Sequence, residues 1–342
     1  MSNVAFVLSG GGAKGSFELG CADYLIRTKQ ENPQVIVGVS TGNLNAAMLA
    51  QGKGYDGLVA QLDKLRDVWL KLKGNRDVYY RRLPGMAGLL FKADSIYSNK
   101  PLWDLIRGYV TAEALRESGR VFRIGVVGLK SGDYFTVDGS YGRILDMIRA
   151  SATVPVYFNP VDLDNERWVD GGVRNLTPLN CAFRALSELR AAGAGGDSAP
   201  DTMYVILASP LASRRVADDR EVSDGIKIGI RCLELLVDEV YANDLQLALT
   251  INEALRYFER VKAAGIVLPE GFPFAKYRYV NMVVIEPPRL FMDSLEFDPE
   301  KIRTAYEAGK VAAREACEKA AQMGGSNVKR EMFALESTIL RG

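Results

Sequence analysis

The chain has 342 residues, of which 48% are hydrophobic and 25% charged, and its 43 Lys and Arg nearly balance its 42 Asp and Glu. This composition is typical of a globular protein with a full core, and the net charge of +1 gives no reason to expect a nucleic acid as partner. The chain contains no histidine, which excludes Ser-His-Asp triads, Cys-His dyads and HExxH zinc sites.

Cysteine usage and the N-terminus set further limits on the class of protein. The four cysteines are widely spaced and form no CxxC pair, so we expect neither a disulfide framework nor a metal site, and no cofactor. The first residues lack a basic segment followed by a long apolar one, and no run of about 18 apolar residues occurs. We therefore expect a cytoplasmic protein without a transmembrane segment. Peripheral membrane association or export by a signal-less route stays open.

Short apolar runs alternate with helical patterns in the first part of the chain. Val4–Leu8 predicts a buried strand that ends in a glycine-rich turn, and residues 17–26 have helical spacing. Val35–Gly38 predicts a second buried strand, which helices over 44–50 and 58–72 follow.

The alternation continues to the end of the chain. Residues 121–129 and 134–137 predict adjacent strands joined by a turn, and Ile144–Ser151 predicts a helix. An irregular segment between Pro155 and Pro160 then leads to an apolar run that ends at Asp170. Beyond residue 200 the patterns predict strands over 203–208 and 279–285 and helices over 224–262 and 299–323. Strands alternating with helices predict an α/β fold with helices on both faces of a sheet. We expect a single domain over 1–342, in which 200–342 completes the fold and 191–200 is a surface loop.

The segment Gly38-Val39-Ser40-Thr41-Gly42 is the only GxSxG in the chain, and it lies between a predicted strand and a predicted helix. A nucleophile elbow needs this context, because the serine occupies a strained turn and small neighbours let the chain approach itself. The helix N-terminus also favours a developing negative charge. An ordinary serine N-cap is the alternative. The context favours Ser40 as a nucleophile.

The glycine-rich turn Ser9-Gly10-Gly11-Gly12-Ala13-Lys14-Gly15 follows the first predicted strand. We expect the N–H groups of Gly10, Gly11 and Gly12 to be free to converge on an oxyanion. The spacing also fits a dinucleotide fingerprint, but that fold needs an acidic residue at the end of the second strand, where this chain has the GxSxG. A phosphate-binding P-loop would need Ser or Thr after Lys14.

Asp170 is the candidate base. A serine nucleophile in a chain without histidine needs another proton acceptor, and a carboxylate bonded directly to the hydroxyl is the simplest. Asp170 ends an apolar-aromatic run and precedes Gly171 and Gly172. A Ser-x-x-Lys pattern at Ser326 lies in a polar tail and lacks its partner motifs. We expect burial to raise the pKa of Asp170 only modestly, so that activity falls below pH 6.

These three motifs, at 10–15, 38–42 and 170–172, resemble the patatin-like phospholipase family, whose members are serine acyl hydrolases with a Ser-Asp dyad. The resemblance covers about residues 4–180. It implies a three-layer α/β/α fold with a mostly parallel central sheet and an elbow between strand and helix. It further implies a dyad of Ser40 and Asp170 and an oxyanion hole from Gly10, Gly11 and Gly12. The residues that support these motifs would be Lys14, Gly15, Gly38, Gly42, Gly171 and Gly172. Lys14 stands where the family more often has arginine, which keeps the charge but not the planar fork.

The function that the resemblance implies is hydrolysis of fatty acyl esters of phospholipids or lysophospholipids through an acyl-enzyme. The partner would be a lipid or another acyl ester, and the sequence does not say whether a protein partner exists. Two alternatives stay open, a catalytically silent lipid-binding module of the same fold and a nucleotide-dependent oxidoreductase. Segment 76–92, in which cations flank the apolar residues 83–91, is a candidate for peripheral membrane contact. A connection packed on the core is the other interpretation.

Overall fold

A computed structural model describes residues 2–82, 94–194, 199–211, 225–267, 271 and 277–328, with only the backbone described at 225–227 and 229–241. Within this described part of the chain, the main sheet has eight strands. Its strands are β1 (Val4–Leu8), β2 (Val35–Gly38), β5 (Val121–Gly128), β6 (Tyr134–Asp138), β7 (Val161–Leu163), β8 (Glu166–Asp170), β9 (Asp201–Ile206) and β10 (Val280–Ile285). A small separate sheet pairs β3 (Tyr80–Arg81) with β4 (Tyr97–Ser98).

The core of the main sheet is parallel. The strands follow the order β10-β9-β1-β2-β5-β8-β7, and the neighbours from β10 to β5 all run parallel. Two antiparallel additions adjoin β5, namely β6 and the β8–β7 hairpin. The predicted hairpin after residue 121 is therefore confirmed, with its first strand ending at Gly128. β9 and β10 extend the sheet beyond β1, although they come from the chain after residue 200.

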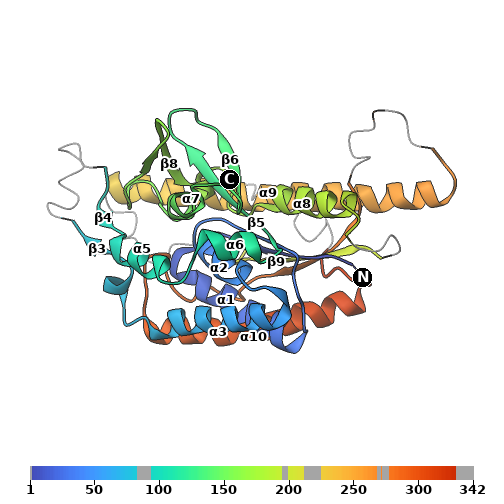
Figure 1. The fold of residues 1–342 in the computed structure, drawn as a ribbon, viewed down its shortest axis with the longest axis horizontal. Coiled ribbons are helices and arrows are strands. Elements are labelled where there is room, and N and C mark those ends of the chain that lie inside the picture. The colour runs from blue at the N-terminus through green and yellow to red at the C-terminus, as the bar shows by residue number, and fades with distance from the viewer. Residues whose placement is uncertain are drawn as a thin grey trace, which may run out of the picture.

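Helices cover both faces of this sheet, which confirms the predicted three-layer α/β/α fold (Figure 1). They are α1 (Gly15–Asp23), α2 (Thr41–Ala50), α3 (Gly54–Lys71), α5 (Lys100–Arg107), α6 (Ala112–Glu117), α7 (Ile144–Ser151), α8 (Leu179–Ala191), α9 (Gly225–Ala263) and α10 (Pro299–Gln322). Figure 1 shows α3 and α10 along the bottom of the molecule and α8 and α9 along the top.

The central strands are apolar without interruption because both of their faces are buried. In β1, Phe6 and Leu8 belong to the core beneath α1, α2 and α10, whereas Ala5 and Val7 belong to the core beneath α8 and α9. Side chains alternate between the faces of a strand, so one short run supplies both cores. This arrangement fixes the register of β1 in the middle of the molecule.

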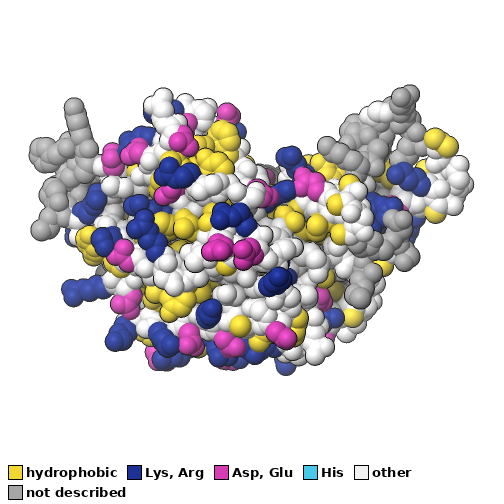
Figure 2. All heavy atoms as spheres, in the orientation of Figure 1, with side chains coloured by type: hydrophobic (Ala, Val, Ile, Leu, Met, Phe, Trp, Pro, Cys, Tyr) yellow, Lys and Arg dark blue, Asp and Glu magenta, His cyan; other side chains and the backbone are white. Residues whose placement is uncertain are grey.

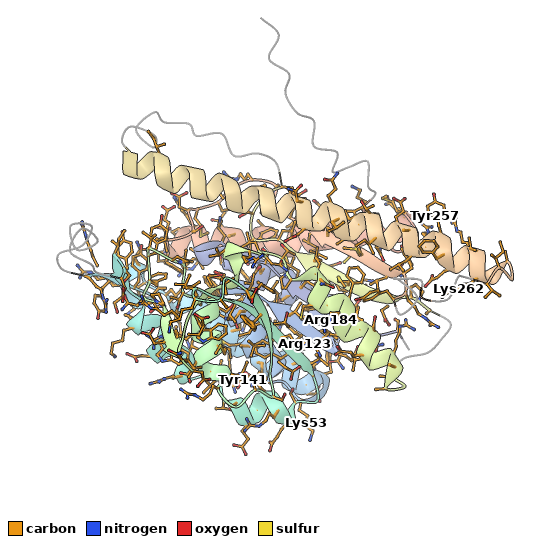
Figure 3. All side chains as sticks on the ribbon, turned by 90° about the horizontal axis from the view of Figure 1, so that it is seen from above. Lys53, Arg123, Tyr141, Arg184, Tyr257 and Lys262 are labelled. Carbon is orange, nitrogen blue, oxygen red and sulfur yellow. The ribbon has the colours of Figure 1, made fainter. Side chains whose placement is uncertain are left out.

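Helix α9 occupies the predicted 224–262 stretch and crosses the upper face (Figure 3). Leu245 and Leu249 are buried in the core on this side, while Leu247 is exposed. Tyr257 and Lys262 lie near the C-terminal end of the helix (Figure 3). Of the helices that the structure describes, none is both long and apolar enough to cross a membrane.

Candidate active site

Ser40 lies in the turn between β2 and α2, as the GxSxG pattern predicts. Its backbone has φ 55° and ψ −129°, a conformation that residues other than glycine rarely adopt. Strain of this kind persists only where the surrounding structure holds it, and it is concentrated at functional sites. The side chain is 7% exposed at the N-terminus of α2. Ser40 is therefore held in the geometry of an elbow, with its hydroxyl near a helix N-terminus.

The glycines on either side of Ser40 let the strand and helix pack without side chains between them. A Cβ on Gly38 would lie 2.4 Å from the carbonyl oxygen of Gly42. A Cβ on Gly42 would lie 2.4 Å from the carbonyl oxygens of Leu8 and Ser9. Both positions therefore exclude any larger residue, and they bring α2 against the end of β1.

Strand β5 brings Asp170 to this elbow. Gly38, at the end of β2, is opposite Ile124, and Asp170, at the end of β8, is opposite Val126 on the same strand. Because β8 runs antiparallel to β5, the ends of β2 and β8 meet over Gly125. A Cβ on Gly171 would lie 2.5 Å from the carbonyl oxygen of Gly125. Two segments separated by about 130 residues in the sequence therefore end side by side.

The Asp170 carboxyl is buried and strongly perturbed. Burial raises its pKa to about 7, although the Ser40 hydroxyl and the Gly172 N–H both act to lower it. The Gly172 N–H donates to Asp170 Oδ1 at 2.8 Å. Within the described part of the chain, Oδ2 accepts no well-aligned hydrogen bond, so the nearby Ser40 hydroxyl does not form one in this conformation. The expectation of a modest pKa shift is wrong, because the site leaves a carboxylate with few donors and no solvent.

The glycine-rich turn lies directly against Ser40. A Cβ on Gly10 would be 3.0 Å from the Cβ of Ser40 and 2.4 Å from the Leu176 side chain. Gly12 has φ 59°, and a Cβ there would lie 2.0 Å from the carbonyl oxygen of Ser294. The turn thus approaches the serine through its backbone.

The prediction of three free N–H groups in this turn is wrong for one of them. The Gly10 N–H donates to the Leu176 carbonyl at 3.1 Å, so it already has an acceptor. The N–H groups of Gly11 and Gly12 have no acceptor among the residues that the structure describes. The turn therefore presents two donors, not three.

Lys14 and Gly15 end this turn and begin α1. The Lys14 side chain is buried and packs against Gly11. A Cβ added to Gly11 would lie 3.4 Å from the Cβ of Lys14. A Cβ on Gly15 would lie 2.1 Å from Thr41 Cγ2. Gly15 therefore lets α1 begin directly beside the start of α2.

Three positioning contacts come from residues to which the sequence assigned no role at the site. The Ser40 N–H donates to Ser151 Oγ at 3.3 Å, and the Asp170 N–H donates to the Thr153 carbonyl at 3.0 Å. The Leu176 carbonyl holds Gly10, as described above. Ser151 is the last residue of α7 and Thr153 follows two residues later, in the stretch 150–158 between the elbow and Asp170. Their spacing carries no catalytic pattern, so only the fold reveals these roles.

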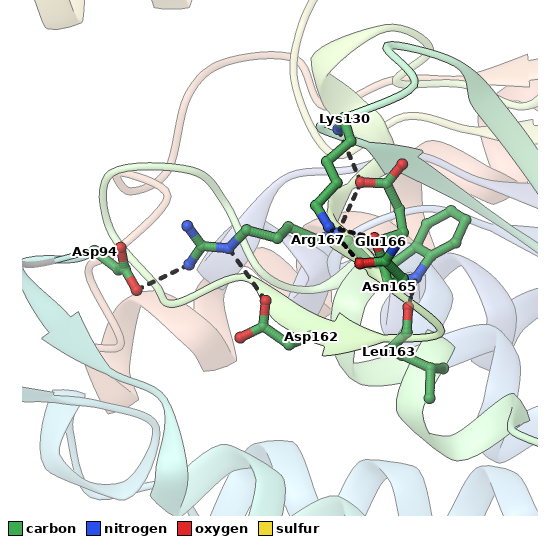
Figure 4. A network of polar contacts seen from close by, with 8 residues as sticks. Asp94, Lys130, Asp162, Leu163, Asn165, Glu166 and Arg167 are labelled. Atoms are coloured by element: carbon green, nitrogen blue, oxygen red, sulfur yellow. Dashed lines mark hydrogen bonds and ion pairs between the residues drawn. The ribbon is translucent and has the colours of Figure 1, made fainter.

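An exposed network secures the β7–β8 hairpin that carries Asp170 (Figure 4). Arg167 bridges Asp94 at 2.8 Å and Asp162 at 3.1 Å. The Glu166 carboxylate accepts hydrogen bonds from the backbone N–H groups of Lys130, Ser131 and Arg167. These bonds lower its pKa to about 2, and the bond from Lys130 contributes most. The hairpin is thus tied both to the β5–β6 turn and to the segment that leads into β4.

The candidate membrane segment 76–92 is only partly described. Residues 83–93 lie outside the described residues, so the structure does not test their role. Arg82 Nη1 donates to Asn159 Oδ1 at 2.8 Å. On the face shown in Figure 2, acidic and basic side chains are interspersed.

Comparison with known proteins places this arrangement in a family. The model of the patatin-like phospholipase family matches residues 6–183, more than half of the chain. The protein belongs to the patatin-like phospholipase family. The matched residues contain the glycine-rich turn, Ser40 and Asp170, and they end within α8. Membership identifies the protein with a family of lipid hydrolases.

Individual relatives are distant. The chain is 25% identical over 185 residues to the probable lipid hydrolase 463L of Invertebrate iridescent virus 6, covering 52% of this chain and 62% of the viral protein. The match thus spans less than two thirds of that relative. Among solved structures, the patatin-like protein is similar to VipD from Legionella pneumophila, with a TM-score of 0.44 and 15% identity over 93% of this chain and 67% of VipD. It is also similar to a chain of the ExoU-SpcU complex from the type III secretion system of Pseudomonas aeruginosa, with a TM-score of 0.31 and 16% identity over 98% of this chain and 74% of that chain.

Proposed function

We propose that this patatin-like protein is a serine acyl hydrolase that cleaves fatty acyl esters of phospholipids or lysophospholipids. The observation that supports this most strongly is the meeting of the strained Ser40 with the buried Asp170, whose Oδ2 accepts no well-aligned bond from the described residues. A hydroxyl beside an unsatisfied carboxylate has the proton acceptor that a serine nucleophile needs.

The reaction proceeds in two halves. Ser40 Oγ attacks the ester carbonyl carbon while its proton passes to Asp170 Oδ2. The negative charge that develops on the carbonyl oxygen is bound by the N–H groups of Gly11 and Gly12, and the alcohol leaves with the proton from Asp170. Water then passes a proton to the same carboxylate as it attacks the acyl-serine, and that proton moves to Ser40 Oγ as the fatty acid leaves, which restores the enzyme.

The rest of the chain supports the same proposal. We propose that residues 1–342 act as one domain, because β9 and β10 belong to the same sheet as the elbow strand β2. The viral relative named above is a probable lipid hydrolase. We therefore propose a lipid substrate for this chain as well. Segment 76–92 stays a proposed membrane contact.

Covalent labelling tests the proposal directly. Purified protein is treated with a fluorophosphonate and digested for mass spectrometry, and hydrolysis of phosphatidylcholine and lysophosphatidylcholine vesicles is measured in parallel. We expect one adduct, on Ser40, and release of fatty acid that Ser40→Ala abolishes. An unlabelled protein that binds vesicles without releasing fatty acid would instead be a silent lipid-binding module.

A further inference from the structure

A buried acid that the proposed reaction does not use lies beneath the glycine-rich turn. Glu18, on α1, is fully buried. Its Oε2 accepts a hydrogen bond from Asn45 Nδ2 at 3.0 Å. Asn45 is itself held, since its Nδ2 also donates to the Gly15 carbonyl at 3.0 Å and its Oδ1 accepts from Trp69 Nε1 at 2.9 Å. One oxygen of Glu18 is therefore fixed by a rigid neighbour, and the other faces the turn.

The Ser9 hydroxyl connects Glu18 to the turn. Ser9 Oγ lies 3.5 Å from Glu18 Oε1 and 3.4 Å from the Gly10 carbonyl oxygen. It also accepts the Ala208 N–H at 2.8 Å. A hydroxyl has one proton and accepts about two hydrogen bonds. Ser9 can therefore donate to Glu18 or to Gly10, but not fully to both.

The protonation of Glu18 decides between these two acceptors. Burial raises the pKa of the Glu18 carboxyl well above its usual value, despite the hydrogen bonds from Asn45 and Ser9. A protonated carboxyl donates its own hydrogen to Ser9 Oγ. Ser9 then accepts from Glu18 and Ala208 and donates to the Gly10 carbonyl, which uses its full capacity.

The Gly10 carbonyl matters because of the peptide plane to which it belongs. The carbonyl of Gly10 and the N–H of Gly11 are parts of one rigid planar unit. The preceding peptide is fixed by the bond from the Gly10 N–H to Leu176. A bond to the Gly10 oxygen therefore sets the direction in which the Gly11 N–H points.

We propose that Glu18 and Ser9 form a hydrogen-bond relay that holds the Gly10–Gly11 peptide plane and so positions the Gly11 N–H for the oxyanion. The relay runs from the Glu18 carboxyl through Ser9 Oγ to the Gly10 carbonyl. Neither side chain touches substrate, so both are positioning residues. This inference rests on the proposed hydrolase function, since only that function gives the Gly11 N–H an oxyanion to bind.

Three substitutions separate the relay from simple packing. Ser9→Ala removes the link, Glu18→Gln keeps a donor in the place of the carboxyl O–H, and Glu18→Met removes it. Tyr306→Phe is the matched control, because it removes another buried hydrogen bond to the same region, from Tyr306 to Asp23 on α1 at 2.8 Å. For each variant, kcat and KM are measured on a soluble short-chain ester, together with the melting temperature.

We expect Ser9→Ala and Glu18→Met to lower kcat about tenfold while KM changes less than about twofold. The loss is smaller than the factor of about 10²–10³ in kcat that removal of an oxyanion donor typically costs, because the Gly11 N–H is still present but points in the wrong direction. Glu18→Gln should keep kcat within about threefold of the parent, because the amide N–H can replace the carboxyl proton. Tyr306→Phe should lower the melting temperature without changing kcat.

The relay is refuted if Ser9→Ala has the parent kcat, or if Glu18→Gln loses as much activity as Ser9→Ala. Equal losses of kcat in Ser9→Ala and Tyr306→Phe would also refute it, because they would show a general effect of destabilisation. Ser40→Ala is measured beside these variants. If it still hydrolyses the ester, the proposed function fails; if it is inactive while Ser9→Ala is fully active, only the relay fails.

Discussion

Two fully buried carboxyl groups flank the candidate site, Glu18 under the glycine-rich turn and Asp170 beside the elbow. Burial raises the pKa of both. They differ in their partners, because each oxygen of Glu18 lies within hydrogen-bond distance of a polar side chain, whereas Asp170 Oδ2 has no hydrogen-bond partner among the described residues. The surroundings of Glu18 suit a neutral acid with a fixed place in the structure. Those of Asp170 suit a group that exchanges a proton with Ser40.

Substitutions of Asp170 and its partner Ser40 should have the largest effect on activity. Asp170→Asn and Ser40→Ala should each lower kcat/KM by at least about 10³, and the double variant should be little worse, because the two groups act as one unit. The measurement is ester hydrolysis with fold checked by circular dichroism. If Asp170→Asn keeps a tenth of the activity, the base is another residue.

Gly12→Ala tests whether the glycine-rich turn supplies an oxyanion donor. The added Cβ would lie 2.0 Å from the backbone oxygen of Ser294 at a φ of 59°, so the turn has to move. We expect kcat/KM to fall by about 10², the cost of losing one oxyanion donor. Gly54→Ala is the control, because Gly54 has a similar φ of 64° with nothing within 4 Å of the added atom. A similar loss in both variants would mean that backbone strain alone, and not the donor, matters.

The pH dependence of protein stability provides a second test of the environment of Asp170. The pKa of Asp170 is raised from 3.8 to about 7, so the folded state holds this proton more tightly than the unfolded state. The fold therefore loses stability from this group as pH rises from about 4 to 7, by at most about 4 kcal/mol. Asp170→Asn removes that penalty, and its melting temperature should exceed that of the parent by several degrees at pH 8 and by less at pH 5.

Thermal unfolding over pH 5–8 measures this difference. A gain from Asp170→Asn that does not change with pH would show that Asp170 does not titrate in this range. A lower melting temperature at pH 8 would show that the ionised carboxylate has stabilising partners that the structure does not reveal.

The smallest effect should come from an exposed carboxylate whose pKa is shifted the other way. Hydrogen bonds lower the pKa of Glu166 to about 2, so its contribution to stability is present above about pH 4.5 and is lost as pH falls toward 2. Glu166→Gln should lower the melting temperature by a degree or so at pH 7 and by less at pH 3. Hydrolysis should be unchanged, and a large loss of activity would mean that this network controls Asp170.

The sequence was sufficient for those features that depend on local pattern. The strand and helix around Ser40 were predictable because an apolar run, flanking glycines and a helical pattern are contiguous there. β7 and the helices α5 and α6 were not identified because they are short. α8 was also not identified, although its buried residues Leu179, Ala182 and Leu186 recur at steps of three and four. The perturbation of Asp170 was underestimated because its environment depends on how β8 pairs with β5. The capture of the Gly10 N–H by Leu176 likewise depends on a contact across about 165 residues.

The pH dependence of Ser40 labelling tests the central claim, that Asp170 is the base that activates Ser40. The rate of fluorophosphonate labelling is measured from pH 5 to pH 9 for the parent and for Asp170→Asn, with circular dichroism at each pH. We predict a single-proton rise centred near pH 7 for the parent, set by the pKa of Asp170, and no such rise in the variant. A parent whose labelling does not change with pH, or an Asp170→Asn variant with the same rise near pH 7, would contradict the account.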